Sequence, residues 1–561
     1  MVQPVMRGLL PLIPVLTLLA WEDLPSRRPF PGQTRVKLVI RTPQGKPTGL
    51  RLRVTDASGA YFAPLGHASM AESRRSAGDV LFGDGKTSPL ELAALVYDGA
   101  QIDLPPGSYK FAARKGFEYE PVDMQVSIGT PPEQTVTLPL RKFADFEAQG
   151  WYPGDTHMHF PDPSGIRYEM ECEGLRVCSL LIYKNGYARP PRPGEGVFLN
   201  VEHFTGKLSP VSDAEHFVKV GEEFRNGLLA HLIFQNLKQI VWPVSTGGLR
   251  ESGAGGYDWP LMLGASDDAR AQRALVTWAH WPYPSMEAPL DIALGRIDSL
   301  DILTTGNPFE HHPELVAIYK MHGPKAYSTP PIEMYYHYLN CGFRLAVSSG
   351  SDKMAQNPPM GSARVYVKTK GGLDYDSWIE GIREGRTFIS NYPLLEMSVD
   401  GKIAGDTLRL SPGKAKLHVR ARARSIEPYE VLEIIVNGAV VAKSTPGGPG
   451  TRYEAALDQV IEVERGGWIA ARAHGPMMLP YGATWWQMPV FAHTSPIYLD
   501  MPGRPAIAEK SAEILLEQLG YLERWAKEKA NFPTADARAQ ALDYVAQATK
   551  VYEDAKAGSG K

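Results

Sequence analysis

The chain has 561 residues, too many for one hydrophobic core, and at about 150 residues per domain this length predicts three or four domains. Lys and Arg total 59 and Asp and Glu total 62, so the formal net charge of −3 gives no electrostatic reason to expect a nucleic acid or a membrane surface as a partner. Hydrophobic residues make up 43% of the chain, which excludes wholesale disorder. The 54 glycines and 47 prolines favour many turns, and therefore β structure and long loops.

The first 20 residues are typical of an export signal. One positive charge, Arg7, precedes the mostly apolar run 8–20, which is too short to cross a bilayer comfortably. Pro11 and Pro14 also discourage a membrane-spanning helix. We therefore expect a signal peptide on a periplasmic or extracellular protein, with no stable membrane insertion beyond that signal. An uncleaved anchor or a misassigned start is the alternative.

The cysteines give no evidence of disulfide bonds, whereas the distribution of the histidines favours a metal site. The three cysteines form no disulfide framework; Cys172 and Cys178 either pair or are buried small apolar residues, and we favour burial. Ten of the 14 histidines lie between residues 151 and 340. We therefore look for a metal site in that part of the chain.

Residues 35–140 alternate like the strands of a β-sandwich. Val36, Leu38 and Ile40 alternate with the charged residues 35, 37 and 41, and the run 50–54 repeats the pattern. Turn-forming residues follow each run. The segment resembles the carboxypeptidase-regulatory-like modules that are often found on secreted enzymes, a resemblance that implies no chemistry of its own.

Residues 145–395 predict a different architecture. Short apolar strands such as 177–183 and 273–280 alternate with helical stretches, of which 376–385 carries its apolar residues on one stripe. Alternating strands and helices favour a parallel α/β core. We interpret the glycine-rich stretch 244–260 as a mobile loop over a site and not as a phosphate-binding loop, because no strand-to-helix fingerprint accompanies it.

The chain returns to β structure at 396–500 and then becomes helical. Apolar side chains of the run 416–424 share one face, and Asn437–Gly438 between two apolar runs is the signal of a two-residue hairpin. We predict a second β-sandwich here. Residues 505–556 carry apolar residues at helical spacing, interrupted at 532–533, and predict a helical hairpin with a structural role.

Candidate metal ligands stand at the ends of predicted strands. In GDTHMHF, residues 157 and 159 point to one face of an extended chain, so the two histidines can bind one cation together, and Asp155 could orient a ring N–H. Further carboxylates and imidazoles follow in three segments, and this donor set suits zinc, manganese or iron at the rim where barrel folds carry their chemistry. These further residues are Glu222 or Glu223, His231, His280 and Asp352.

Taken in order, these blocks resemble the PHP superfamily of metallohydrolases, and more narrowly its CehA/McbA-type branch. The matching stretches are GDTHMHF, GEEFRNG with AHLIF, WAHWP, SGSD, EGRTFISNYPLL (384–395) and FAHTSPIYL (491–499), and the similarity covers about residues 145–500. The resemblance implies a distorted seven-stranded β/α barrel, up to three metals and a hydrolytic activity; characterised relatives cleave phosphoesters, and some of this branch cleave carbamate esters. The expected fold is multidomain α/β plus β: a distorted (β/α)7 PHP-type barrel flanked by two β-sandwich modules, with a C-terminal helical hairpin.

Carried over residue by residue, the resemblance implies two metal positions that share a bridging glutamate. Glu223 fits the Gly-x-Glu pattern better than Glu222, which stays open as the alternative. The other implied ligands are His157, His159 and Asp352 at the first position, and His231 and His280 at the second.

Two departures from the family pattern both affect the third metal position. The strand pattern that usually ends Asp-His-Asn reads Tyr-Lys-Asn at 183–185, and the usual Asp-x-His reads Asp-Lys-Met at 352–354. We therefore expect two metals, and we hypothesise that the ammonium of Lys184 supplies positive charge in the vacated region. A surface lysine left by drift is the alternative. His203 and His216 have no family counterpart, and we expect surface or loop positions for them.

The sequence thus predicts a metallohydrolase that acts on a small molecule. Two divalent ions (Zn, Mn or Fe) would activate water for attack on an ester, carbamate or amide carbonyl, with Lys184, Arg225 and Asn226 as candidates for stabilising negative charge. A phosphoesterase of the same fold and a non-catalytic exported binding protein with a decayed barrel are the alternatives. A serine hydrolase is disfavoured because the serines at 348–351 lack a Gly-x-Ser-x-Gly elbow.

Overall fold

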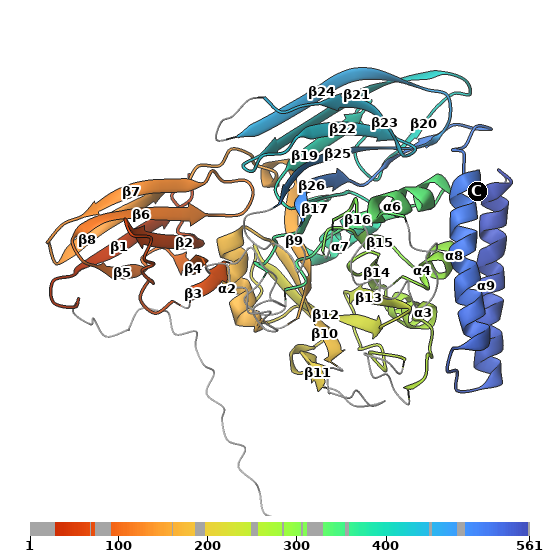
Figure 1. The fold of residues 1–561 in the computed structure, drawn as a ribbon, viewed down its shortest axis with the longest axis horizontal. Coiled ribbons are helices and arrows are strands. Elements are labelled where there is room, and N and C mark those ends of the chain that lie inside the picture. The colour runs from red at the N-terminus through yellow and green to blue at the C-terminus, as the bar shows by residue number, and fades with distance from the viewer. Residues whose placement is uncertain are drawn as a thin grey trace, which may run out of the picture.

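The computed structural model describes residues 29–67, 69–72, 91–159, 161–185, 197–247, 256–282, 285–304, 307–310, 329–353, 358–447, 452–478 and 488–558. The predicted signal at 1–20, the middle of the glycine-rich loop at 248–255 and Met354 lie outside these ranges. Within them the chain is mixed α/β, with seven α-helices and four sheets. Figure 1 shows an N-terminal β unit, a central α/β unit, a second β unit and a helical pair on the far side of the central unit. Among the described helices, none combines the length and hydropathy that a membrane span requires.

The N-terminal unit consists of two β-sheets around one core. The strand orders are β5-β1-β8 and β3-β4-β2-β6-β7. Val36, Leu38 and Ile40 of β1 are fully buried, as the alternation predicts, and they share their core with Leu50 and Leu52 of β2. The strands are β1 (Thr34–Arg41), β2 (Gly49–Asp56), β3 (Ser69–Glu72), β4 (Glu91–Tyr97), β5 (Gln101–Leu104), β6 (Gly107–Arg114), β7 (Val122–Ile128) and β8 (Glu133–Pro139).

A 16-stranded sheet begins in the central unit. Seven of its strands follow the order β16-β15-β14-β13-β12-β10-β9, and neighbours are parallel except for the two pairs made by β13. The segment after β16 returns to β9 through a parallel bridge between Met158 and Lys353. The strands are β9 (Trp151–Met158), β10 (Val177–Asn185), β11 (Val197–Leu199), β12 (Phe217–Asn226), β13 (Ala230–Gln235), β14 (Leu275–Trp278), β15 (Ser299–Asp301) and β16 (Ala346–Ser348).

Two helices of the central unit begin at side-chain caps. Asp162 and Asp374 each accept a backbone N–H of the helix that follows, which satisfies a donor left over in the first turn. The second of these helices, α7, buries Trp378, Ile379 and Ile382, the stripe that the sequence predicts. The helices are α2 (Pro163–Glu173), α3 (Met262–Ala271), α4 (Ala288–Ala293), α6 (Pro331–Asn340) and α7 (Tyr375–Arg383), with short 3-10 helices η2 (Glu147–Gln149) and η3 (Val201–His203).

The second β unit shares the long sheet with the central unit. β18 pairs directly with β26, so the long sheet continues from the central unit into the second β unit. Residues 395 and 396, where we expected the boundary, lie inside β19, a strand of the separate sheet β19-β21-β24. The predicted hairpin is present, because Asn437 and Gly438 join β22 to β23 with φ of 51° and 89°. The strands are β17 (Arg364–Lys368), β18 (Thr387–Ser390), β19 (Leu394–Val399), β20 (Thr407–Arg409), β21 (Ala415–Ser425), β22 (Val431–Val436), β23 (Ala439–Ser444), β24 (Tyr453–Val463), β25 (Gly467–Met478), β26 (Pro489–Thr494) and β27 (Ile497–Asp500).

The C-terminal helices form a pair that packs on the central unit (Figure 1). They are α8 (Glu509–Glu528) and α9 (Ala535–Lys556). Leu515 and Leu519 of α8 and Tyr552 of α9 are buried in the main core, and the Tyr552 hydroxyl donates a hydrogen bond to the carbonyl of Pro289 in α4 at 2.7 Å. The pair is therefore part of the core of the central unit.

A pair of buried carboxyl groups, at the start of α4, connects this helix to α3 beside the C-terminal helical pair. Glu287 accepts hydrogen bonds from the backbone N–H groups of Met262 and Leu263 at 3.2 and 2.9 Å, and Asp291 lies beside it. Both carboxyl groups are 0% exposed. Burial raises the pKa of Glu287 to about 7, and burial together with Glu287 raises the pKa of Asp291 well above its ordinary value.

Replacing Asp291 with Asn should weaken the pH dependence of stability. A raised folded-state pKa stabilises the fold below the unfolded pKa of about 4, and this stabilisation is lost as the pH rises through the folded-state pKa. Because the amide has no such proton to lose, we expect the free energy of unfolding of Asp291→Asn to exceed that of the wild type at pH 8 and to match it near pH 4. Calorimetric unfolding across this range measures the difference. Identical pH profiles would contradict the protonated pair.

Candidate metal centre

The two histidines of the first motif lie at the end of β9. The side chains of His157 and His159 point to the same side of the extended chain, both are buried, and their Nε2 atoms lie 3.0 Å apart. A Cβ added at Gly350 would lie 2.5 Å from the backbone nitrogen of His157. The segment after β16 can therefore pass this close to β9 because residue 350 has no side chain.

The neighbouring glutamates of β12 point to opposite faces of the strand. Glu223 Oε1 lies 3.2 Å from both His231 Nδ1 and His280 Nε2, and Oε2 lies 3.3 Å from His159 Nε2. Glu222 instead accepts a hydrogen bond from a loop backbone N–H at 2.9 Å. Of the two candidates, the structure brings Glu223 to the histidines.

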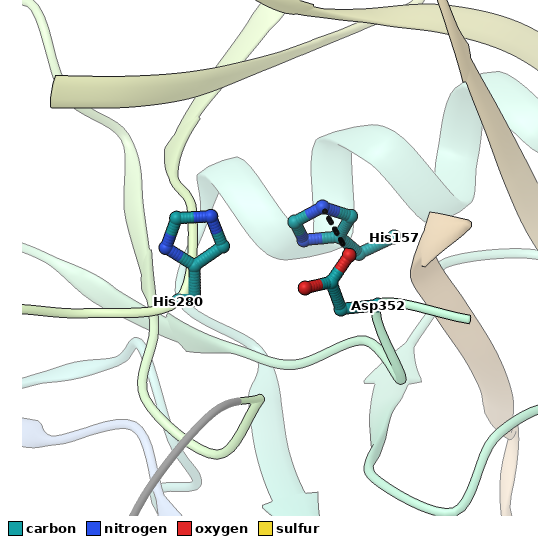
Figure 2. Close-up of side chains that lie close together, drawn as sticks. All are labelled: His157, His280 and Asp352. Atoms are coloured by element: carbon teal, nitrogen blue, oxygen red, sulfur yellow. Dashed lines mark ion pairs between the residues drawn. The ribbon is translucent and has the colours of Figure 1, made fainter. Parts of the chain in front are cut away.

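The remaining candidate ligands come from three other strands. β13 pairs antiparallel with β12 in a register that sets His231 opposite Arg225. His280 follows β14 and Asp352 follows β16, with φ of 31° and 49°, a backbone region that is costly outside glycine and typical of functional sites. Figure 2 shows His157, His280 and Asp352 close together, with His157 Nε2 3.3 Å from Asp352 Oδ1.

The donor atoms fit metal ions. Two ligand atoms about 2.1 Å from one tetrahedral ion lie about 3.4 Å from each other, and the separations around Glu223 run from 3.2 to 3.7 Å. Glu223 Oε2 is also a buried atom that accepts no hydrogen bond from the described residues. These groups could therefore hold a metal ion. Three overlapping sets have all their donors within 4.8 Å of one another: His157 with His280 and Asp352, His157 with His159 and Glu223, and Glu223 with His231 and His280.

Burial and mutual contacts shift the pKa values of the cluster in opposite directions. Burial alone would raise the pKa of Glu223, but Arg225 and the surrounding histidines hold it well below its ordinary value. Burial disfavours the charged form of His159, yet the carboxylates of Asp352 and Glu223 beside its ring raise the pKa of His159 to about 9. A bound cation would take the place of protons held by the rings, so its binding would release protons.

We expected Asp155 to orient the ring of a candidate histidine ligand, but the carboxylate beside the ring of His157 is that of Asp301. Asp155 accepts hydrogen bonds from the backbone N–H groups of His157 and Ser351 at 3.0 and 2.9 Å, so it fixes the two chain segments and no ring. Asp301, at the end of β15, lies 3.5 Å from His157 Nδ1. This contact favours a proton on Nδ1 and leaves Nε2 to face the cluster. Its position at a strand end is the sequence signal that could have identified Asp301.

Arg225 lies at the cluster, whereas Asn226 closes a turn. Arg225 Nε is 3.6 Å from Glu223 Oε2 and 3.5 Å from His231 Nε2. The Asn226 side-chain oxygen accepts two backbone hydrogen bonds after β12, at 3.0 and 3.1 Å, and its amide nitrogen donates to Thr246 Oγ1 at 3.1 Å. Of these two predicted charge-stabilising residues, Arg225 has the contacts that the role requires.

Tyr183 and Lys184 lie on opposite faces of β10. The centre of the Tyr183 ring is 4.3 Å from that of His159, so Tyr183 is a contact of the cluster that sequence reasoning did not single out as functional. The buried ammonium of Lys184 lies 5.8 Å from the centre of the Phe198 ring on β11. A role for Lys184 at the metal position stays a prediction.

Two histidines and two cysteines that we considered in the sequence are not among the candidate metal ligands in the structure. His203 lies in η3 and is partly exposed. His216 lies in a loop but is buried, with Nε2 3.3 Å from Glu171 Oε2. Cys172 and Cys178 are both unpaired as disulfides and buried, as we expected.

Comparison with known proteins adds nothing to these observations. No protein-family model matches the chain, and no curated protein matches it.

Substituting Gly350 by Ala should disturb the cluster. The new Cβ would press on His157, and overpacking of this kind costs about 1–3 kcal/mol. We expect a lower Tm and weaker zinc uptake, measured by thermal unfolding and by elemental analysis after dialysis. Gly165→Ala in α2 is the matched control, because a Cβ there meets nothing within 4 Å and alanine favours a helix. Equal behaviour of the two variants would count against the close packing.

Removing the charge of Asp301 should weaken metal binding. Outer carboxylates that orient a ligating ring typically contribute 10–100-fold in metal affinity, so Asp301→Asn should lose about tenfold or more. Competition with a chromophoric zinc chelator measures this affinity. Asp458→Asn removes an exposed carboxylate of β24 and should leave the affinity unchanged. Unaltered affinity in Asp301→Asn would exclude the orienting role.

Proposed function

We propose that this chain is a metal-dependent hydrolase whose two divalent cations share the carboxylate of Glu223. The observation that carries the proposal is that two of the three ligand groups share this one buried side chain. His157, His159 and Asp352 would complete the first position, and His231 and His280 the second. Imidazole and carboxylate donors suit zinc, manganese or iron.

We also propose that the seven strands from β9 to β16 form a distorted PHP-type β/α barrel of the CehA/McbA kind. Their order in the sheet and the bridge between Met158 and Lys353 support closure of the sheet on itself. His159, His280 and Asp352 follow the carboxyl ends of parallel strands, which is the end where barrel enzymes carry their active sites. The predicted export and the small-molecule substrate belong to the same proposal.

The chain's own residues would prepare the reaction. When bound, a pair of divalent cations lowers the pKa of water and polarises the oxygen of the group under attack. Glu223 stays ionised between the two positions, and Asp301 holds His157 in the orientation that presents Nε2. Arg225 places a permanent positive charge beside the cluster, where it would stabilise negative charge that develops on the substrate. Burial of these groups strengthens each of the interactions.

The substrate class that fits best is an ester, carbamate or amide carbonyl. Phosphoryl transfer usually requires several cationic groups around the phosphate, and Arg225 is the cation that ion-pairs with the described cluster. The same contact supports a phosphoesterase as the second candidate, since a guanidinium also binds phosphoryl oxygens.

The test is a panel of chromogenic carboxylic esters, carbamates and phosphodiesters assayed with zinc, manganese and iron. We expect metal-dependent turnover of carbonyl substrates and a loss of at least about 100-fold in His159→Ala, because a ligand of the first position is gone. His418→Ala, which removes an exposed histidine of β21, should keep the wild-type rate.

The outcomes separate the alternatives. Turnover of phosphodiesters alone would establish the second candidate. A wild type that shows no metal-dependent turnover, or a fully active His159→Ala, would contradict the hydrolase proposal and favour a binding protein.

A further inference from the structure

Tyr183 lies between two members of the cluster. The centre of its ring is 4.3 Å from that of His159, and the guanidinium carbon of Arg225 lies 5.2 Å from the same ring centre. Tyr183 is 0% exposed, His159 1% and Arg225 8%. A guanidinium is attracted to the face of an aromatic ring, and the attraction is strongest where both are withdrawn from water.

The backbone of Arg225 is fixed independently of this contact. Its N–H donates to the carbonyl of Val244 at 3.1 Å, and its carbonyl accepts from the N–H of Thr246 at 2.9 Å. The long side chain then has to reach Glu223 Oε2, 3.6 Å from its Nε. The same Nε lies 3.5 Å from His231 Nε2. The ring of Tyr183 adds a surface under the guanidinium carbon, 5.2 Å from the ring centre, that helps to set the direction of this flexible side chain.

We infer that Tyr183 is a positioning residue for Arg225, so that a preformed positive charge meets the substrate oxygen on which negative charge develops. This inference rests on the proposed hydrolase function. A charge already in place requires no reorganisation at the moment of reaction, which is the source of most electrostatic stabilisation in active sites. A lysine ammonium could not replace it, because it has neither the plane that stacks on a ring nor the fork of donors.

The contact uses the aromatic ring and not the hydroxyl, which gives a matched pair of variants. Tyr183→Phe keeps the ring and should retain near wild-type kcat, whereas Tyr183→Leu removes the ring and should lower kcat about tenfold with little change in KM. Arg225→Gly should lower kcat about 100-fold. Elemental analysis of each variant should find the metal content of the wild type.

Rescue by added guanidinium ion distinguishes positioning from simple packing. We expect millimolar guanidinium, compared with sodium at equal ionic strength, to restore part of the kcat of Arg225→Gly. The restoration should persist when Tyr183→Phe is added and disappear when Tyr183→Leu is added. The same pattern is expected in the guanidinium-dependent rise of Tm, which is measured without any substrate.

The outcomes distinguish failure of the positioning role of Tyr183 from failure of the hydrolase proposal. Equal kcat in Tyr183→Phe and Tyr183→Leu, or equal rescue and equal Tm response in both double variants, would overturn the inference while wild-type turnover leaves the hydrolase standing. An inactive wild type would contradict the hydrolase, and the Tm response would still test the placement of the guanidinium by the ring. Tyr183→Met repeats the comparison if Tyr183→Leu does not fold.

Discussion

The candidate centre depends on one buried carboxylate. An ionised group in the interior is costly unless charges and hydrogen bonds compensate it, and Glu223 is 1% exposed. Four imidazoles and one guanidinium surround it, each with a nitrogen within 3.7 Å of a carboxylate oxygen: His157, His159, His231, His280 and Arg225. These side chains come from β9, β12, β13 and the end of β14. The order of strands in the sheet therefore brings the compensating charges and hydrogen-bond donors together around Glu223.

Helix α2 links this centre to the N-terminal unit. On its inner side, Glu169 pairs with Lys353 at 3.2 Å, next to the candidate ligand Asp352. On its outer side, Glu171 accepts a hydrogen bond from Thr48 at 2.5 Å and Glu173 accepts one from Arg51 at 3.0 Å. The N-terminal sheets therefore contact the same helix that contacts the loop of Asp352, and these contacts connect the N-terminal unit to the candidate centre.

Local patterns in the sequence predicted much of the fold and of the site. The period of two identified the core of β1 and the shared face of residues 157 and 159, because an extended backbone dictates both. The Asn437–Gly438 hairpin and the stripe of α7 follow from equally local rules. The Gly-x-Glu pattern of the resembled family favoured Glu223 over Glu222, and the structure shows that Glu223 is on the face of β12 that meets the histidines.

Long-range pairing accounts for what the sequence did not reveal. The pairing of β18 with β26 joins residues about 100 positions apart, and it carries one sheet from the central unit into the second β unit. Asp301 stands at a strand end, which the sequence can indicate, but its contact with His157 depends on strands that are far apart in the chain. Tyr183 likewise becomes visible as a partner of Arg225 only when β10 and β12 lie side by side.

Anomalous scattering from crystals grown with zinc or manganese tests the shared carboxylate most directly. Two peaks per chain are expected, both within bonding distance of Glu223, with the first also bound by His157, His159 and Asp352 and the second by His231 and His280. Three tightly bound ions, a single peak that does not touch Glu223, or no peak at all would contradict the two-metal centre.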